Sequence, residues 1–578
     1  MINYVHLEIK RIQSYLFSVP KLKAMVGANV ILGETTMGTK DDLEKDNHPE
    51  KLENMVQLAV ANGGLSPVSS ISEETKKLFS DSDLEDDSPI EFAEKGIVSR
   101  HGGHFSAFFT SKEKAEEFES AARMMIAEKL PGAMVKCDIF DEKQMKEKLV
   151  ERKRSDEEKQ GESKGPKYKN DNPAFVQALA EIPQFALCEG SGNEPASEKK
   201  MSASYISKEE KAGEFYSGKT NDIVGMLYKK DSKIPKGHEY KYSFEDIADN
   251  KYLAVIHADG NNMGKLSSDW ARENLKKHNN IEDGKVLNIF IENELKREAF
   301  FYSMRKATRR AIRSSIKAIF HTVPERYRLF MAGGDDLLLV CEAKYAMPFI
   351  KSYAEEIKQN KLISGEDLSI GAGIVIAHHN VPIYQLHALA EELASNAKKR
   401  NKHLEKDDSV VDWIVSSESY IGNLDEYRKR NIKHEAKLTK ETVYMTMKPY
   451  KILGENELSL ESLMSASKNL KNDKDSKRAS RNKYKKLLDD LKKGSVGGRL
   501  LYKEMKESLQ DKNKKDAFMD IKKILGIPEK DESWPYIKFG NEEELFTCVP
   551  DIIQLAEIDL LGKADSKKNV KKEGKNNE

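Results

Sequence analysis

Between positions 328 and 340 the chain reads Arg328-Leu-Phe-Met-Ala-Gly333-Gly334-Asp335-Asp336-Leu-Leu-Leu-Val340. This stretch predicts two apolar strands joined by a tight turn, because adjacent glycines permit a positive-φ bend that other residues resist. The turn carries Asp335 and Asp336 at the mouth of a sheet, where carboxylate oxygens can hold a hard divalent cation. Alone, such a turn is typical of an exposed hairpin, so the metal-site interpretation needs a second element.

The second element is a strand-loop-helix segment, Leu253-Ala-Val-Ile-His-Ala-Asp259-Gly-Asn-Asn-Met-Gly-Lys265. If its strand lies beside the hairpin, Asp259 joins Asp335 and Asp336, and three carboxylates can share two divalent ions roughly 4 Å apart. Mg²⁺ or Mn²⁺ held there would lower the pKa of an attacking hydroxyl and neutralise a triphosphate leaving group. The sequence therefore predicts phosphoryl transfer, with Asp259, Asp335 and Asp336 as the catalytic metal ligands.

Two loops and one lysine are the candidate nucleotide-binding groups. Loops that contain glycine can present backbone N–H groups to phosphate oxygens. The candidates are Gly260, Asn261, Asn262, Met263 and Gly264 in the first loop, Gly333 and Gly334 in the turn, and Lys398 near the end of a predicted helix. For Lys398, contact with phosphate and a role at the negative end of the helix dipole are both open.

Several other polar residues have structural explanations. We expect His257 to be a packed residue of the strand, and His378 and His379, which follow a predicted strand, to be structural. A basic run at helical spacing, from Arg305 to Lys317, favours a solvated helix face, with contact to RNA or a partner as the minority interpretation.

The hairpin has an earlier counterpart, which predicts an internal repeat. The first 140 residues read strand, helix, hairpin, helix, strand, and the same order returns around the later hairpin. The first hairpin has His104 and Phe105 where the second has the two aspartates, so the metal ligands are missing from it. The predicted fold class is α+β, with two ferredoxin-like βαββαβ palm domains, a small intervening domain and a C-terminal helical domain.

The predicted domain boundaries follow from changes in composition and periodicity. They are a degenerate first palm (1–140), a charged linker and small inter-palm domain (141–250), a catalytic second palm (251–420), a helical domain (421–563) and a disordered tail (564–578).

Composition narrows the class of protein. Charged residues make up 33% and no long apolar run occurs, which predicts a protein without a membrane span. The four cysteines lack metal-ligand spacing and fit a reducing cytoplasm. Lysine plus arginine equals aspartate plus glutamate, at 96 each, so any nucleic-acid contact must depend on local patches.

These motifs together resemble the large palm-domain subunit of type III CRISPR effector complexes. The resemblance is carried by Ile12-Gln13, Lys23 and Gly27-Ala28-Asn29, by the segment from Ala258 to Gly264, by Gly333-Gly334-Asp335-Asp336, by Ala377 to Pro382, and by Ala390 to Lys398. It covers nearly the whole chain, although the C-terminal part matches only in character.

The resemblance implies an antiviral enzyme that, when the complex captures target RNA, joins ATP into cyclic oligoadenylate second messengers. It implies partners: a CRISPR RNA, target RNA, and repeat-bearing backbone and small subunits. In the family the intact palm supplies metal and one ATP, and the degenerate palm helps to seat the second nucleotide. Asp259, Asp335 and Asp336 fall on the family's metal-binding positions.

The chain departs from many members in two ways. It starts at the first palm and contains no His-Asp dipeptide, so we expect no DNase activity from a His-Asp nuclease domain. The region that holds a four-cysteine zinc ribbon in many members keeps only Cys188, so we expect no structural zinc.

Alternatives to cyclic oligoadenylate synthesis stay open. The resemblance also extends to relatives with this architecture that couple ATP to S-adenosylmethionine instead of cyclising adenylates, and no residue here decides between the two acceptors. A non-catalytic scaffold subunit belongs to another class, and the three retained carboxylates oppose it because clustered like charges are costly without a cation. A free-standing cyclase without an RNA partner is the third alternative, and the degenerate first palm and helical C-terminal domain disfavour it.

Overall fold

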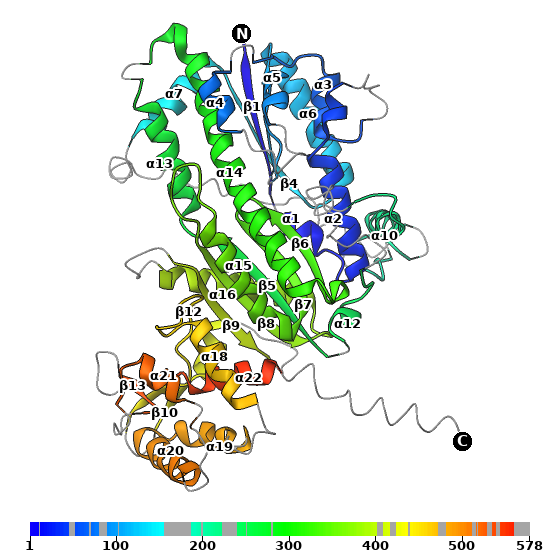
Figure 1. Ribbon diagram of the computed structural model, residues 1–578. Coiled ribbons are helices and arrows are strands. Elements are labelled where there is room, and N and C mark those ends of the chain that lie inside the picture. The colour runs from blue at the N-terminus through cyan, green and yellow to red at the C-terminus, as the bar shows by residue number, and fades with distance from the viewer. Residues whose placement is uncertain are drawn as a thin grey trace.

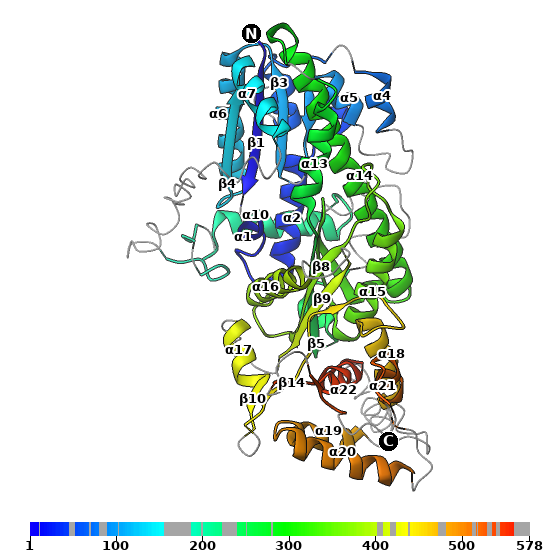
Figure 2. The same cartoon turned by 90° about the vertical axis from the view of Figure 1, so that its left-hand side faces the viewer.

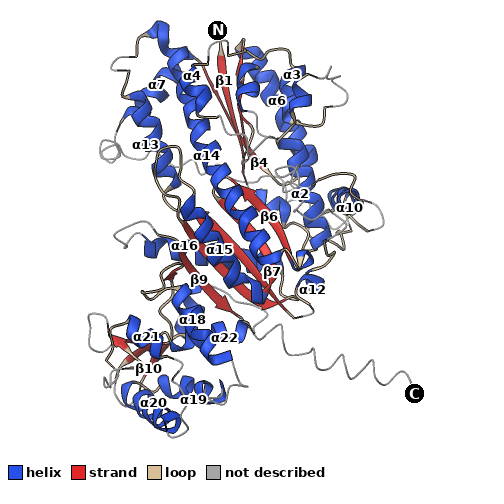
Figure 3. Cartoon of the chain, viewed as in Figure 1, coloured by secondary structure: helices blue, strands red, loops and turns tan. Residues whose placement is uncertain are grey.

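The computed structural model shows an elongated molecule with two sheets, one above the other, and a third small sheet near the C-terminus (Figures 1 and 3). It describes residues 1–10, 12–44, 52–68, 71–79, 89–101, 103–154, 186–192, 194–197, 200–221, 240–249, 251–278, 281–401, 408–416, 424–436, 440–471, 481–510, 516, 518–528, 534–538 and 544–559. The predicted disordered tail and most of the predicted charged linker lie outside these residues.

The first palm is a βαββαβ unit, as the repeat predicts. Its strands are β1 (Asn3–Lys10), β2 (Ile97–Ser99), β3 (His104–Phe109) and β4 (Met134–Phe140), in the antiparallel order β2-β3-β1-β4. The chain enters α1 (Ile12–Leu16) and α2 (Leu22–Thr36) after β1, and α6 (Lys112–Lys129) after β3. Short helices α3 (Met55–Ala61), α4 (Glu73–Lys77) and α5 (Pro89–Glu94) fill the long connection between α2 and β2.

The second palm repeats this topology. Strands β5 (Tyr252–Gly260), β6 (Tyr327–Gly333), β7 (Asp336–Glu342) and β8 (Ile370–His378) are antiparallel in the order β8-β5-β7-β6. Strand β9 (Val410–Val415) runs parallel to β8, and β12 (Tyr450–Lys451) pairs with β9. The result is a six-stranded sheet whose central strand, β5, ends at Asp259 and Gly260.

Helices cover both faces of the second sheet (Figure 2). Helices α14 (Val286–Phe320) and α15 (Ala346–Gln359) lie on one face, and α16 (Ile383–Asn401) lies on the other against β8, β9 and β5. Helix α13 (Met263–Leu275) follows β5 and packs against α14. Because α14 contains 35 residues, it extends along both palms (Figure 1).

The two palms are packed together through α2. Apolar residues of α2, such as Leu22, Met25 and Val26, belong to the same buried core as the second sheet. The buried Asn29 side chain donates a hydrogen bond to the Phe330 carbonyl of β6 at 2.7 Å. This hydrogen bond joins α2 of the first palm to a strand of the second palm. Helix α10 (Ala203–Tyr216) covers the outer side of α2, and α7 (Glu142–Lys153) packs against α13 and α14. A short helix, α12 (Phe244–Ile247), leads into β5.

The C-terminal region is helical, as predicted, but it also contains a sheet that helical periodicity could not reveal. Its helices are α17 (Leu424–Asn431), α18 (Leu460–Lys471), α19 (Arg481–Leu491), α20 (Ser495–Gln510), α21 (Met519–Ile524) and α22 (Val549–Ile558). Its strands β10 (Lys433–Glu435), β11 (Thr442–Tyr444), β14 (Glu544–Phe546) and β13 (Ile537–Lys538) form a mixed sheet in that order. Strands of two or three residues are too short to show alternation.

Cys188, in the region between the palms, is buried, and its sulfur accepts a hydrogen bond from the Ser191 N–H at 3.4 Å. Among the helices in the described parts of the chain, none combines the length and apolarity needed to cross a bilayer.

Candidate active site at the Gly-Gly-Asp-Asp hairpin

Three carboxylates meet where β5 ends and the β6–β7 hairpin turns. Asp259 is the penultimate residue of β5, Asp335 lies in the turn, and Asp336 is the first residue of β7. One oxygen of each carboxylate lies within 4.8 Å of an oxygen of the other two. The structure therefore brings together the three residues that the sequence predicts as metal ligands.

Glycines around the three carboxylates allow the turn to bend, the turn to approach β5, and a ligand to reach the backbone. Gly334 has φ +63°, so it supplies the left-handed bend of the turn. At Gly260, a Cβ atom would lie 2.8 Å from the Asp335 Cβ, so a side chain there would push the turn away. Gly333 and Gly264 face open space, which leaves room for a ligand to approach their backbone.

The loop between β5 and α13 contains the remaining predicted nucleotide-binding residues. Asn262 has φ +57° and precedes Met263, the first residue of α13, so the chain turns sharply from the strand into the helix. The first-turn N–H groups of α13 are suited to an anion. Asn261 is instead buried, and its side-chain nitrogen donates to the Ser369 hydroxyl at 2.9 Å. Asn261 thus fixes the loop.

Lys398 reaches the carboxylates from α16. Its ammonium group forms an ion pair with the Asp259 carboxylate. Helix α16 can lie this close to β8 because Gly371 and Gly373 carry no side chains: added Cβ atoms would lie 2.4 Å from Lys398 Cγ and 1.9 Å from the Ala390 carbonyl oxygen, respectively. The structure thus places Lys398 beside the carboxylates, and its contact with phosphate stays a prediction.

The pKa values of Asp335 and Asp336 indicate that nearby positive charge does not balance the negative charge of the three carboxylates. Burial, followed by repulsion from Asp259, raises the pKa of Asp335. Burial, followed by repulsion from Asp335 and then Asp259, raises the pKa of Asp336. Lys398 offsets only part of this repulsion. A donor set made of carboxylate oxygens fits Mg²⁺ or Mn²⁺, and such ions would supply the missing charge.

A pH-dependent effect on stability follows from the raised pKa values. The folded, metal-free protein holds protons on Asp335 and Asp336 more tightly than the unfolded chain, so its free energy of unfolding falls as pH rises above about 4. We expect Asp336→Asn to raise the free energy of unfolding in EDTA by about 1 kcal/mol, the scale of one pKa unit, and by more at pH 8 than at pH 5. Urea unfolding at both pH values measures this difference, and destabilisation at pH 8 would contradict it.

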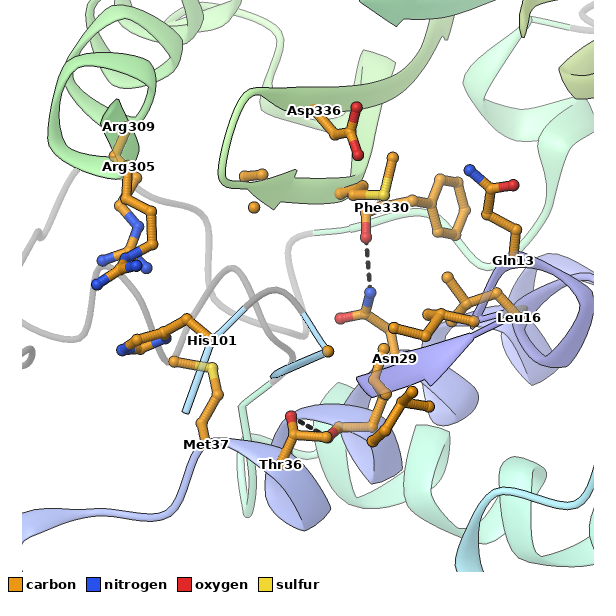
Figure 4. Close-up of a pocket in the computed structure, with 17 residues that line it drawn as sticks. Gln13, Leu16, Asn29, Thr36, Met37, His101, Arg305, Arg309, Phe330 and Asp336 are labelled. Atoms are coloured by element: carbon orange, nitrogen blue, oxygen red, sulfur yellow. Dashed lines mark hydrogen bonds between the residues drawn. The ribbon is translucent and has the colours of Figure 1, made fainter. Parts of the chain in front are cut away.

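A cavity of about 280 Å³ opens beside the hairpin, between the two palms (Figure 4). Gln13, Leu16, Asn29 and Thr36 come from the first palm, and Phe330 and Asp336 come from the second (Figure 4). A neighbouring cavity of about 320 Å³ is lined by His6, His101, His104, Arg297 and Arg305 together with Gly334, Asp335 and Asp336. The hairpin therefore contacts two cavities, each lined by both palms.

The arginines of α14 correct one expectation from the sequence. Arg305 and Arg309 are 4% and 3% exposed, so a solvated face is the wrong description of this part of the basic run. Arg305 donates to the Glu298 carboxylate at 2.7 Å, and both arginines line the cavity beside the hairpin. Helical spacing alone could not show this, because α14 is covered on several sides by the first palm, α13 and α15.

Other residues at the site gave little or no signal in the sequence. Asn29 was part of the Gly27-Ala28-Asn29 motif, but its contact with Phe330 joins residues about 300 positions apart. His101 and Thr36 also line the cavity, and nothing in their local sequence indicates this.

Parts of the chain are similar to known proteins. Residues 252–408 match the family described as Cas10/Cmr2, second palm domain. The CRISPR system Cmr subunit Cmr2 of Pyrococcus furiosus is 29% identical over 184 residues, which cover 30% of this chain and 20% of that protein. The matched segment thus spans about a fifth of that relative's length.

Solved structures of low sequence identity also resemble the chain. A crystal structure of Csm1 from T. onnurineus has 12% identity and a TM-score of 0.46, over 97% of this chain and 70% of that one. A Csm1–Csm4 cassette in complex with cA4 has 12% identity and a TM-score of 0.44, over 97% and 70% of the two chains.

Proposed function

Because this chain is a Cas10-type subunit that carries the second palm domain of the Cas10/Cmr2 family, we propose that it is a metal-dependent nucleotidyltransferase acting on ATP. The observation that carries this proposal is the meeting of Asp259, Asp335 and Asp336 beside two cavities lined by both palms. A central strand and a tight hairpin fix the carboxylates before any ligand arrives, and preorganised charge of this kind is what phosphoryl transfer requires.

The proposed chemistry divides between the acidic cluster and its surroundings. Asp259, Asp335 and Asp336 would hold Mg²⁺ or Mn²⁺, which lowers the pKa of an attacking hydroxyl and neutralises triphosphate charge. Lys398, which pairs with Asp259, would supply positive charge to a phosphate oxygen. The first-turn N–H groups of α13 and the open backbone at Gly333 would donate to phosphate oxygens.

The two cavities suit two nucleotides. The cavity beside α2 combines apolar side chains, including Ile12, Leu16 and Leu32, with the amide groups of Gln13 and Asn29, a lining that fits a purine ring. Arg305 and Arg309 lie across the cavity from these groups (Figure 4) and would attract phosphate. A second nucleotide in the neighbouring cavity would lie between the same hairpin and the first palm's His6 and His104.

The product, the activating signal and the partners that we propose follow the family resemblance. The product would be a cyclic oligoadenylate, synthesis would begin when target RNA is captured, and the chain would work in a complex with a CRISPR RNA and repeat-bearing subunits. S-adenosylmethionine as the acceptor would use the same metal-binding aspartates, so the product distinguishes the two versions. A non-catalytic scaffold fits the site less well, because half-buried carboxylates with raised pKa values destabilise a protein that never binds metal.

Replacement of Lys398 tests the phosphate-binding role. We expect Lys398→Gln to raise the KM for ATP by about 10- to 100-fold, because a charge-assisted hydrogen bond contributes about 1.5–3 kcal/mol. Lys399→Gln is the matched control, since Lys399 is an exposed neighbour on the same helix. Steady-state kinetics over a range of ATP concentrations measures the change, and equal KM values for the two variants would contradict the assignment.

The proposed activity itself is tested by pyrophosphate release. The chain, assembled with guide RNA and partner subunits, is given ATP and Mg²⁺ or Mn²⁺, with and without target RNA. We expect metal-dependent pyrophosphate release that increases with target RNA. A complex that binds target RNA and releases no pyrophosphate with either metal would support the scaffold alternative instead.

A further inference from the structure

A second group of potential metal ligands lies near the carboxylate cluster but is separate from it. His257 of β5 and His387 and Glu391 of α16 each offer one ligand atom, and these atoms lie within 4.8 Å of one another. His387 and Glu391 are four residues apart, so they share one face of α16. His257 is two residues before Asp259, so its side chain is on the same face of the sheet, toward α16.

The two histidines are buried, and they have ring nitrogens without partners. His257 is 6% exposed and His387 is 3% exposed, and their rings meet edge to face with centroids 5.4 Å apart. His257 Nδ1 and His387 Nε2 are buried and make no hydrogen bond. A buried polar atom without a partner costs about 1–3 kcal/mol, so two such atoms in adjacent rings call for an explanation beyond packing.

We propose that His257, His387 and Glu391 form a second metal site, which binds a divalent cation of the zinc class. Two imidazole nitrogens and one carboxylate oxygen are a donor set that suits Zn²⁺ and the late first-row metals, whereas Mg²⁺ prefers oxygen ligands alone. Ligand atoms around tetrahedral zinc lie roughly 3.3 Å apart, given bonds of about 2.0–2.1 Å, so binding would draw the three side chains slightly together.

The surroundings of the group fit this role. Glu391 is 40% exposed, which gives a cation a path from solvent. The Gln13 side chain of the first palm interacts with the Glu391 carboxyl, and Phe17 packs on His387 at a centroid distance of 4.8 Å.

The proposed metal site lies between β5 and α16, so a bound cation would affect how these two elements are held together. A cation held there would join β5 to α16, and α16 carries Lys398 to the catalytic carboxylates. Through Gln13, which also lines the cavity beside the hairpin, the site contacts the first palm as well. This inference departs from the expectation of no zinc, which was based on the missing cysteines of the four-cysteine ribbon. It does not depend on the proposed nucleotidyltransferase activity.

Cobalt binding tests the proposal. The full chain is stripped with EDTA and titrated with Co²⁺, which absorbs strongly in a tetrahedral site with nitrogen ligands and weakly in an octahedral site of oxygens. We expect one equivalent of the strong visible band, displaced by Zn²⁺. His387→Gln and Glu391→Gln should each weaken this binding at least tenfold, whereas the exposed His321→Gln should not change it. Asp335→Asn should retain the band, which separates this site from the catalytic cluster.

Two results would overturn the inference. One is the absence of a strong band in the wild-type protein. The other is a band of equal affinity in the wild-type protein and in Glu391→Gln. Because Glu391 is half-exposed, its replacement should not prevent folding, and circular dichroism of each variant checks this. With zinc bound, the wild-type protein should also gain thermal stability that Glu391→Gln does not gain.

Discussion

Replacement of both Asp335 and Asp336 by alanine is expected to lower the formation of adenylate product by at least about 10³-fold, the scale seen when charge-stabilising groups are removed from phosphoryl-transfer enzymes. Two of the three carboxylates within 4.8 Å are lost in this variant, so Asp259 alone would have to hold the metal. Product formation per mole of complex, measured with saturating ATP and Mg²⁺, gives the size of the effect.

The same variant should keep its fold and its RNA contacts. Both aspartates lie at a hairpin tip, and both carry pKa values raised by burial and repulsion, so their removal relieves unfavourable interactions. Target RNA binding by the assembled complex is the control, and we expect it to be unchanged. A variant that binds RNA normally and still makes product at a tenth of the wild-type rate would refute the metal-ligand assignment.

The second large effect is expected at Gly373 of β8. A Cβ atom there would lie 1.9 Å from the Ala390 carbonyl oxygen and 2.6 Å from the Ala394 nitrogen, both of which are backbone atoms of α16. The helix must therefore move away from the sheet, and we expect Gly373→Ala to lower the free energy of unfolding by about 3 kcal/mol or more. Urea unfolding measures this change.

The loss of stability at Gly373 should be accompanied by a loss of activity. When α16 moves outward, Lys398 leaves Asp259, and we expect the KM for ATP to rise as it does in Lys398→Gln. Gly213→Ala is the control, since no heavy atom lies within 4 Å of the added Cβ and alanine favours the helix by about 1 kcal/mol. If Gly373→Ala were as stable as Gly213→Ala, the close packing of α16 on β8 would be wrong.

The repeat and the acidic cluster could be predicted from the sequence because their signals are local. The Gly-Gly turn, the apolar strands beside it and the strand that ends at Asp259 each fall within about a dozen residues, and the order of elements predicts which strands are neighbours. The antiparallel order 4-1-3-2 of both palms follows from that element order. The structure also shows that Gly260 is needed for the approach of Asp335, which the sequence alone could not reveal.

The parts that could not be predicted depend on contacts between distant segments. Arg305 and Arg309 lie in a basic run that predicts a solvated face, yet the packing of α14 against both palms buries them. His257 is buried, as expected of a packed residue, but its contact with His387 requires α16 to cross β5, and no local pattern indicates that crossing. The small C-terminal sheet joins strands that are about 100 residues apart, so it was missed for the same reason.

Mass spectrometry of the small-molecule product is the most direct test of the proposed nucleotidyltransferase activity. The complex of this chain with guide RNA and partner subunits is given ATP, Mg²⁺ or Mn²⁺ and target RNA, with S-adenosylmethionine in half of the samples. We expect a new adenylate species that requires metal and all three aspartates, and the mass of that species identifies the acceptor. The absence of any new adenylate species, from a complex that still binds target RNA, would contradict the proposed nucleotidyltransferase activity.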